Sequence, residues 1–178
     1  MSAVVFGVLI WVFLLPKYPR AMQLLLFTDY ALRVLLYLGA HPERIIPTAE
    51  IARAYAISID HVAKATKALT RQGLLRAVRG ASGGVQLAKE PAQICIGCVV
   101  RQFEADRAPV SCLRPASAEG EAPRERCAIE LGCTLRRAFE RAQAAFYHEL
   151  DRYSLADLLT SQPALVRLLT SKHAEGHP

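Results

Sequence analysis

A short helix, a tight turn and a longer capped helix, followed by a hairpin with a glycine-rich tip, constrain the fold of this chain most. The expected pieces are a helix over 48–55 capped by Thr48, a turn at Ala56 and Ile57, a helix over 59–72 capped by Ser58, and a stop at Gly73. Two short strands, Leu74–Arg79 and Val85–Lys89, are expected around the Gly80–Gly84 tip. This order is typical of a winged helix-turn-helix DNA-binding domain.

Further helices flank this unit. One is expected from Phe27 to Leu38, with Thr28 as its cap, another over Ile94–Phe103, and a short one at 154–159. Cys133–Tyr153 has one apolar face, formed by Leu135, Ala138, Phe139, Ala142, Phe146 and Leu150. The predicted fold class is mainly α with a small β-hairpin wing, a winged helix-turn-helix domain plus a long dimerisation helix. Because the small domain cannot cover that face, we expect the helix to pair antiparallel with its copy in a homodimer.

Positive charge gathers on the expected third helix and wing. The chain has a formal net charge of +6, and His61–Lys89 contains six Lys or Arg and no Asp or Glu. We expect base edges to be contacted by His61, Lys64, Ala65 and Thr66. We expect the DNA backbone or minor groove to be contacted by Arg76, Arg79, Ser82 and Gly83. The DNA-binding set also includes Ser58 and Lys67. A charge run alone is more often a solvated helix face. Together with the helix-turn-helix spacing and the hairpin it indicates DNA binding.

All five cysteines lie between residues 95 and 133. Cys112, Cys127 and Cys133 sit in or beside a polar loop, where thiolates can bind a soft metal or an iron–sulfur cluster. Fourteen residues separate the first two and five separate the last two, which is too wide for a zinc knuckle. Cys95 and Cys98 form a Cys-x-x-Cys that could be redox-active or half of a zinc site. Its apolar neighbours favour two buried core thiols instead.

Several stretches resemble the iron–sulfur winged-helix repressors. They are 22–33 (MQLLLFTDYALR), 78–87 (VRGASGGVQL), 96–101 (IGCVVR) and the ending 149–158 (ELDRYSLADL). The resemblance covers about residues 22–169 and is specific because these motifs occur in the right order. It implies a cytoplasmic repressor that binds an inverted-repeat operator in double-stranded DNA as a dimer. No Ser-His-Asp array, phosphate loop or pair of carboxylates points to an enzyme.

The resemblance also implies a cofactor and its ligands. In this family three loop cysteines hold an iron–sulfur cluster (4Fe-4S or 2Fe-2S), and here these are Cys112, Cys127 and Cys133. In nitric-oxide-sensing members an Asp near the start of the first helix, from the partner subunit, can complete the coordination, and Asp29 holds that position. This favours nitric oxide as the signal, and derepression of nitric oxide detoxification genes, over the alternative of sensing iron or cluster status.

Two departures from the family pattern affect the ligand set. The gap from Cys112 to Cys127 is longer than the family usually shows, which makes Cys112 the least secure ligand. Cys98 stands where the family commonly has Asp, so Cys98 stays open as an alternative thiol ligand.

The first 21 residues are expected to lie outside the domain, with Met22 as the functional start. Residues 3–15 are almost wholly apolar but fall short of the about 20 that a spanning helix needs. The predicted organisation is an extension at 1–21, the winged helix-turn-helix domain at 22–106, a cluster-binding loop at 107–132, dimerisation and C-terminal helices at 133–170 and a tail at 171–178. No stable membrane association is expected. A membrane-tethered redox or metal-binding protein that uses residues 3–15 with Cys95 and Cys98 is the alternative of another class.

Overall fold

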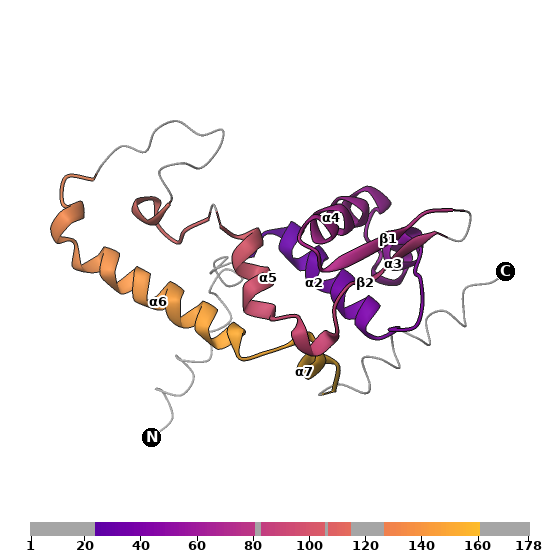
Figure 1. The fold of residues 1–178 in the computed structure, drawn as a ribbon. Coiled ribbons are helices and arrows are strands. Elements are labelled where there is room, and N and C mark those ends of the chain that lie inside the picture. Colours follow the sequence, from indigo (N-terminus) through magenta and orange to yellow (C-terminus); the bar gives the residue numbers. More distant parts are fainter. Residues whose placement is uncertain (1–23, 81–82, 106, 115–126, 161–178) are drawn as a thin grey trace, which may run out of the picture.

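The computed structural model describes residues 24–80, 83–105, 107–114 and 127–160 (Figure 1). Its elements are α2 (Leu26–Gly39), α3 (Thr48–Tyr55), α4 (Ile59–Arg71), β1 (Leu75–Val78), β2 (Gly84–Leu87), η1 (Pro91–Gln93), α5 (Ile96–Phe103), η2 (Ser111–Leu113), η3 (Glu130–Gly132), α6 (Thr134–Asp151) and α7 (Leu155–Thr160). The predicted fold class is confirmed, since helices dominate and the two strands form one antiparallel hairpin. None of the helices in this part of the chain is long and apolar enough to cross a membrane. The apolar run at 3–15 and the tail at 171–178 lie outside the described residues.

The helix-turn-helix follows the local sequence closely. Ala56 ends α3 in the left-handed conformation (φ 53°), which is uncommon for a residue with a Cβ and turns the chain sharply. Ser58 then caps α4, because its side-chain oxygen accepts a hydrogen bond from the backbone N–H of His61 at 3.3 Å. The predicted Thr48 cap is wrong. Thr48 is the first residue of α3, Pro47 precedes it, and no side chain caps that end.

The hairpin is shorter than predicted and is anchored to the helices by a third segment. Its register pairs Leu75 with Leu87 and Val78 with Gly84. Ile46, between α2 and α3, exchanges two backbone hydrogen bonds with Val85, at 3.0 and 2.9 Å. A Cβ at Gly84 would collide with the backbone of Ile46, so this close approach requires glycine. The wing is therefore held against the core along one edge.

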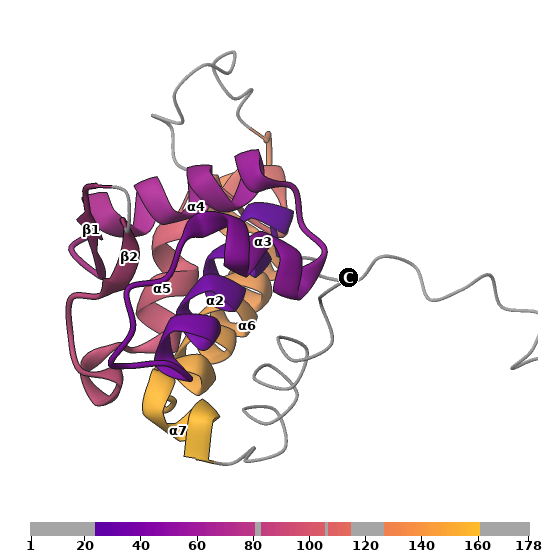
Figure 2. The same ribbon diagram turned by 90° about the vertical axis from the view of Figure 1, so that its right-hand side faces the viewer.

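The core surrounds α2, which packs against α3, α4, α5 and α7 (Figure 2). Its fully buried large side chains are Val34, Leu35, Tyr37, Leu38, Ile46, Ile51, Val62, Leu69, Ile94, Val100 and Leu155. Burying such side chains is worth roughly 1.5–3 kcal/mol each, and Val34, Leu35, Tyr37 and Leu38 of α2 are among them, so α2 contributes strongly to the stability of this region. We call residues 24–105 with α7 the head.

The start of α2 is capped by a residue that lies far from it in the sequence. Thr28 does not cap its own helix, as the sequence predicted, but lies buried inside it. Its hydroxyl donates to Glu104 Oε1 at 2.5 Å, and the backbone N–H of Leu25 donates to the same oxygen at 2.7 Å. Glu104, at the end of α5, thus supplies the acceptor that the sequence assigned to Thr28. It also ties α2 to the point where the cysteine loop begins.

The long helix α6 behaves differently from every helix of the head. None of its side chains is fully buried, and its first half runs away from the head (Figure 1). Its second half packs on α5, where Phe146, Tyr147 and Leu150 contact the core. The apolar face predicted as one surface is therefore divided, and Leu135 at its start is 63% exposed. We call the described residues 107–114 and 127–151 the arm.

Candidate DNA interface and thiol sites

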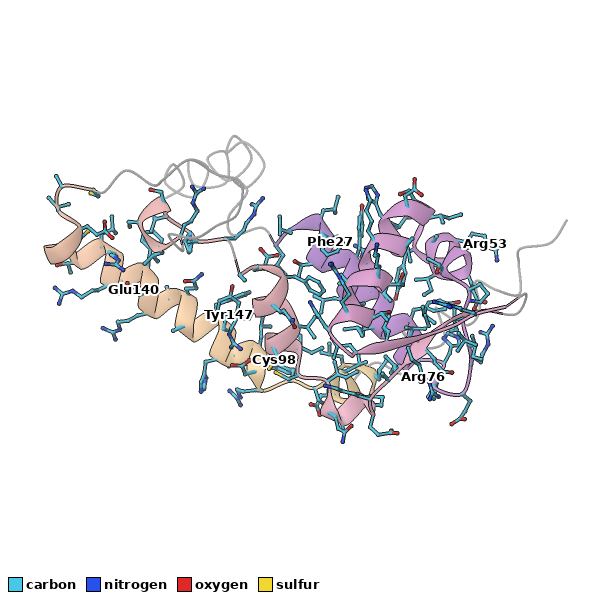
Figure 3. All side chains as sticks on the ribbon, turned by 45° about the horizontal axis from the view of Figure 1, so that its top comes forward. Phe27, Arg53, Arg76, Cys98, Glu140 and Tyr147 are labelled. Atoms are coloured by element: carbon cyan, nitrogen blue, oxygen red, sulfur yellow. The ribbon has the colours of Figure 1, made fainter. Side chains whose placement is uncertain are left out.

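Six cations predicted to face DNA are all exposed. They are Lys64, Lys67, Arg71, Arg76, Arg79 and Lys89. Within the described residues none of them forms an ion pair with Asp or Glu. Unpaired cations on a helix-turn-helix and its wing are the arrangement that releases counterions when a phosphate backbone binds. Figure 3 shows Arg76 on this head and Glu140 far along α6.

The start of α4 presents a mixed polar and apolar surface. His61 is exposed, and its Nδ1 lies 2.8 Å from Ser58 Oγ. Its ring lies 5.4 Å from that of Tyr30 on α2, so the core helix positions it. Ile59 is 56% exposed beside these groups and was missed by sequence reasoning. An exposed apolar residue at the N-terminus of a recognition helix suits contact with a thymine methyl group.

Two residues predicted to reach base edges face the wrong way. Ala65 is fully buried and Thr66 is 5% exposed. The hydroxyl of Thr66 donates to the carbonyl of Ala63 at 2.9 Å, within the helix. Both side chains belong to the face of α4 that packs on the core, which removes them from the DNA-binding set.

The wing keeps most of its predicted groups available. Arg76 and Arg79 are exposed, and Gly80 adopts a positive φ of 122° that favours glycine. The N–H of Gly83 donates to the carbonyl of Gly80 at 2.9 Å, which closes the tip. Ser82 lies outside the described residues. Arg53, on the first helix of the helix-turn-helix, is a further exposed cation (Figure 3).

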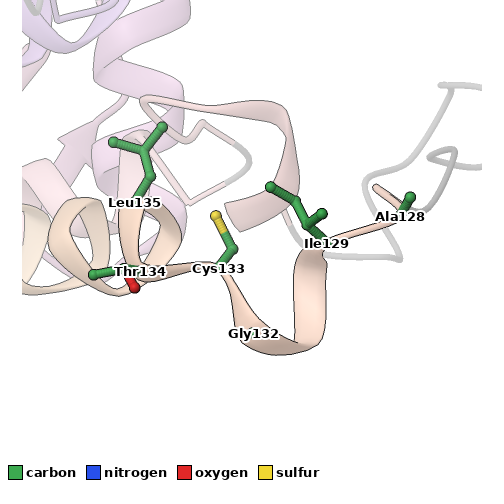
Figure 4. A pocket seen from close by; sticks show the side chains of 6 residues that line it. All are labelled: Ala128, Ile129, Gly132, Cys133, Thr134 and Leu135. Atoms are coloured by element: carbon green, nitrogen blue, oxygen red, sulfur yellow. The ribbon is translucent and has the colours of Figure 1, made fainter.

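The loop thiols lie on the arm. Cys112 in η2 and Cys133 before α6 are half-buried, and Cys127 is exposed. The segment η2 packs against α6, which brings the surroundings of Cys112 onto the helix that Cys133 starts. Cys133 caps α6, because its sulfur accepts from the N–H of Arg136 at 3.4 Å. An open hollow of about 550 Å³ beside it is lined by Ala128, Ile129, Gly132, Cys133, Thr134 and Leu135 (Figure 4).

This donor set fits an iron–sulfur group in its chemistry. Three thiols lie on a polar segment without a shared core role, and thiolates are the usual ligands of such clusters. The three loop sulfurs do not all lie within 4.8 Å of one another in the described single chain. Asp29 lies in the first turn of α2, partly exposed, and pairs with Arg33 at 2.9 Å.

Cys95 and Cys98 are not the buried core thiols that the sequence favoured. Cys95 is half-buried and Cys98 is exposed where α5 meets the end of α6 (Figure 3). Within the described residues they form, with Asp151, the one group of three potential metal ligands whose atoms lie within 4.8 Å of one another. Burial raises the pKa of the Cys95 thiol, side-chain hydrogen bonds to Cys98 and Asp151 raise it further, and the backbone N–H of Cys98 acts in the opposite direction.

The comparisons with known proteins agree with this geometry. Residues 26–161 match the Rrf2 family, described as "Iron-dependent Transcriptional regulator". This chain belongs to the Rrf2 family. It is thus a member of a family of DNA-binding transcriptional regulators, not of enzymes.

Individual relatives of this Rrf2-family chain are similar over most of its length. It is 41% identical over 152 residues to the HTH-type transcriptional regulator NsrR of Geobacillus kaustophilus, which covers 85% of this chain and 99% of that protein. The CymR global cysteine regulator of B. subtilis is 25% identical with a TM-score of 0.59, covering 79% of this chain and 98% of that one. The IscR of T. potens is 22% identical with a TM-score of 0.61. The match covers 82% of this chain and 91% of that one, and it supports the fold.

Proposed function

We propose that this Rrf2-family chain is a homodimeric repressor that senses nitric oxide through an iron–sulfur cluster and controls nitric oxide detoxification genes. The observation that carries the proposal is that the basic surface and the loop thiols lie in different regions of the molecule. An exposed, unpaired basic surface lies on the head, and three thiols without a shared core role lie on the arm. The 41% identity to NsrR over almost its full length supports the choice of signal.

The proposed organisation follows the predicted boundaries. Residues 22–106 form the DNA-binding domain, 107–132 the cluster-binding loop, and 133–170 the dimerisation and C-terminal helices. Residues 1–21 and 171–178 are assigned as an extension and a tail outside these functions. The exposed apolar residues at the start of α6, Leu135 and Ala138, support its role in pairing two chains, since burying them requires a second surface.

For the operator we propose two kinds of contact. His61, Lys64 and Ile59 at the start of α4 read base edges in the major groove. Backbone and minor-groove contacts come from Ser58, Lys67, Arg76, Arg79, Ser82 and Gly83. Exposure of the described members supports this division, because each can approach DNA without unfolding the head.

For the cluster we propose Cys112, Cys127 and Cys133 as thiolate ligands, with Asp29 of the opposite chain as the fourth ligand. The cluster, when bound, supplies iron that nitric oxide can ligate. To take that role, Asp29 must give up its ion pair with Arg33. A carboxylate binds iron more weakly than a thiolate does, so Asp29 would be the ligand that is displaced most easily. A ligand donated across the dimer would make cluster state and dimer geometry depend on each other.

The contacts of the head suggest how a change in the loop reaches the DNA surface. Glu104, where the loop begins, holds the start of α2 through Thr28 and Leu25. Two residues further along α2, Tyr30 contacts the ring of His61 on the recognition helix. We propose that movement of the loop shifts Glu104, and that α2 transmits this shift to α4. The path is short because Thr28 and Tyr30 lie two residues apart near the start of one helix.

Loss of a loop thiol tests the cofactor assignment. Cys127→Ala and Cys133→Ala, purified without oxygen, should lose the visible cluster absorption and most operator affinity. Cys98→Ala is the matched control, because it removes an exposed thiol of α5 that lies beside the opposite end of α6. If the loop variants keep the full cluster spectrum while Cys95→Ala and Cys98→Ala lose it, the ligand assignment is wrong.

Removal of the Thr28 hydroxyl tests the transmission path separately. Thr28→Val keeps the side-chain volume but deletes the donor to Glu104, and should leave the cluster spectrum unchanged. The ratio of operator affinities with and without nitric oxide should shrink, within the roughly 5- to 150-fold span of typical allosteric coupling. Gln102→Ala, exposed on α5, is the control. A ratio equal to the wild-type value would remove Thr28 from the path.

A further inference from the structure

We propose that Cys95, Cys98 and Asp151 bind one thiophilic divalent cation, with Zn²⁺ as the best-suited ion. This site is separate from the proposed cluster site and does not depend on it. Asp151 ends α6 and Cys133 starts it, so the two groups of thiols lie at opposite ends of an 18-residue helix. At about 1.5 Å per residue, that helix is about 27 Å long.

The three ligand atoms already lie close to a metal-binding arrangement. Cys95 Sγ lies 3.6 Å from Asp151 Oδ1, and all three ligand atoms lie within 4.8 Å of one another. Two sulfurs held by one tetrahedral zinc ion, each about 2.3 Å from it, are about 3.7 Å apart. A small closure of the side chains would therefore be enough, with a water molecule as the fourth ligand.

The backbone fixes these side chains in place from both sides. The N–H of Ile96 donates to the carbonyl of Tyr153 at 2.9 Å, and the N–H of Leu155 donates to that of Ile94 at 2.8 Å. These bonds pair the start of α5 with the chain just beyond α6. Gly97 lies between the two cysteines, and a Cβ there would collide with Asp151. The close approach of the carboxylate to the thiols thus depends on a glycine at this position.

Neighbouring groups orient the ligands as outer-shell partners do in metal sites. The N–H of Cys98 donates to Cys95 Sγ at 3.2 Å. Arg101 donates to Asp151 Oδ2 at 2.6 Å, which leaves Oδ1 on the side of Cys95. The guanidinium of Arg101 also lies over the ring of Tyr147, 5.0 Å from its centroid, and is held there. Two thiolates and one carboxylate suit zinc better than a hard cation such as Mg²⁺.

Cobalt titration of the full-length protein tests the proposal without interference from the loop. In a chain with Cys112, Cys127 and Cys133 all replaced by Ala, Co²⁺ should bind in one equivalent and give the sulfur-to-cobalt absorption of a tetrahedral thiolate site. Zn²⁺ should displace it and raise the unfolding temperature. Cys98→Ser in this background should abolish the absorption.

The carboxylate is tested by a matched pair on α6. Asp151→Asn should weaken Co²⁺ binding at least about tenfold, the smallest loss usual for partners of a metal site. Glu149→Gln, exposed two residues earlier and paired with Arg152, should bind as the parent does. The Arg101–Asp151 ion pair is partly exposed, so its loss should leave the fold intact. Equal affinity in the two variants, or a reduced chain that binds no Co²⁺ and forms a Cys95–Cys98 disulfide in air, would overturn the proposal.

Discussion

The head and the arm of this protein are stabilised in different ways. In the head, α2 is enclosed by other helices, and side chains such as Leu35 and Leu38 are at most 1% exposed. In the arm, α6 has 18 residues and no fully buried side chain, while Leu135 and Ile129 are 63% and 66% exposed. The head has a packed hydrophobic core that is formed within one chain. The arm leaves large apolar side chains exposed in the single chain, which is what the proposed pairing of two chains would cover.

This difference fits the function that we propose, in which a stable DNA-binding region is joined to a sensing region. A DNA-binding surface needs side chains held in a fixed arrangement, which a packed core provides. A sensor needs an element whose arrangement changes at a cost of only a few kcal/mol, and such elements come from weakly packed regions. The two regions meet where the second half of α6, with Phe146, Tyr147 and Leu150, packs on α5.

A pair of leucines should show the largest contrast. Leu35→Ala removes a fully buried side chain from the head and should cost about 2–5 kcal/mol of unfolding free energy. Leu135→Ala, made in a monomeric background, should change it by less than about 0.5 kcal/mol, since that side chain is mostly exposed in the single chain. Chemical denaturation measures both. Similar losses in the two variants would mean that the arm is packed within one chain.

A charge on the exposed face of α6 should separate the two chains. Ala142→Glu lies on the face of Leu135 and Ala138, and should convert the dimer to a monomer because an unpaired charge would be buried twice at a two-fold interface. Ala144→Glu is the control, since it is equally exposed but about 200° around the helix. Light scattering at micromolar concentration distinguishes the states. A monomeric wild-type protein would refute the interface itself.

The DNA surface should respond more gradually. Lys64→Ala and Arg79→Ala should each weaken operator binding and lower the slope of log affinity against log salt by about 1, because each removes one positive charge from the DNA-binding face. Arg141→Ala, an exposed cation on the arm, should change neither quantity. Unchanged affinity and slope in both head variants would exclude this face as the DNA-binding surface.

Sequence reasoning succeeded where the determinants are local. The turn at Ala56, the cap at Ser58 and the hairpin follow from residues within a few positions of one another. It failed for Thr28, because its partner Glu104 lies 76 residues away in the sequence. Helical spacing alone also did not fix which face of α4 packs on the core, and so Ala65 and Thr66 were misplaced.

The Cys-x-x-Cys shows the same limit at the candidate sites. Its neighbours Ile96, Val99 and Val100 are buried, as their apolar character indicated. The thiols themselves are not, because the end of α6 lies across the start of α5 and leaves them beside Asp151. No local pattern could bring a residue more than 50 positions away to that place.

The most direct test of the account is operator binding by the cluster-loaded protein during anaerobic titration with nitric oxide and, in parallel, with an iron chelator. Both the visible spectrum and the operator affinity are recorded at each addition. We predict that nitric oxide abolishes operator binding in step with loss of the cluster spectrum. Equivalent additions of the chelator should still have no effect at that point. Full operator affinity after the cluster has reacted with nitric oxide would contradict it. Loss of binding with the chelator but not with nitric oxide would favour a sensor of iron status.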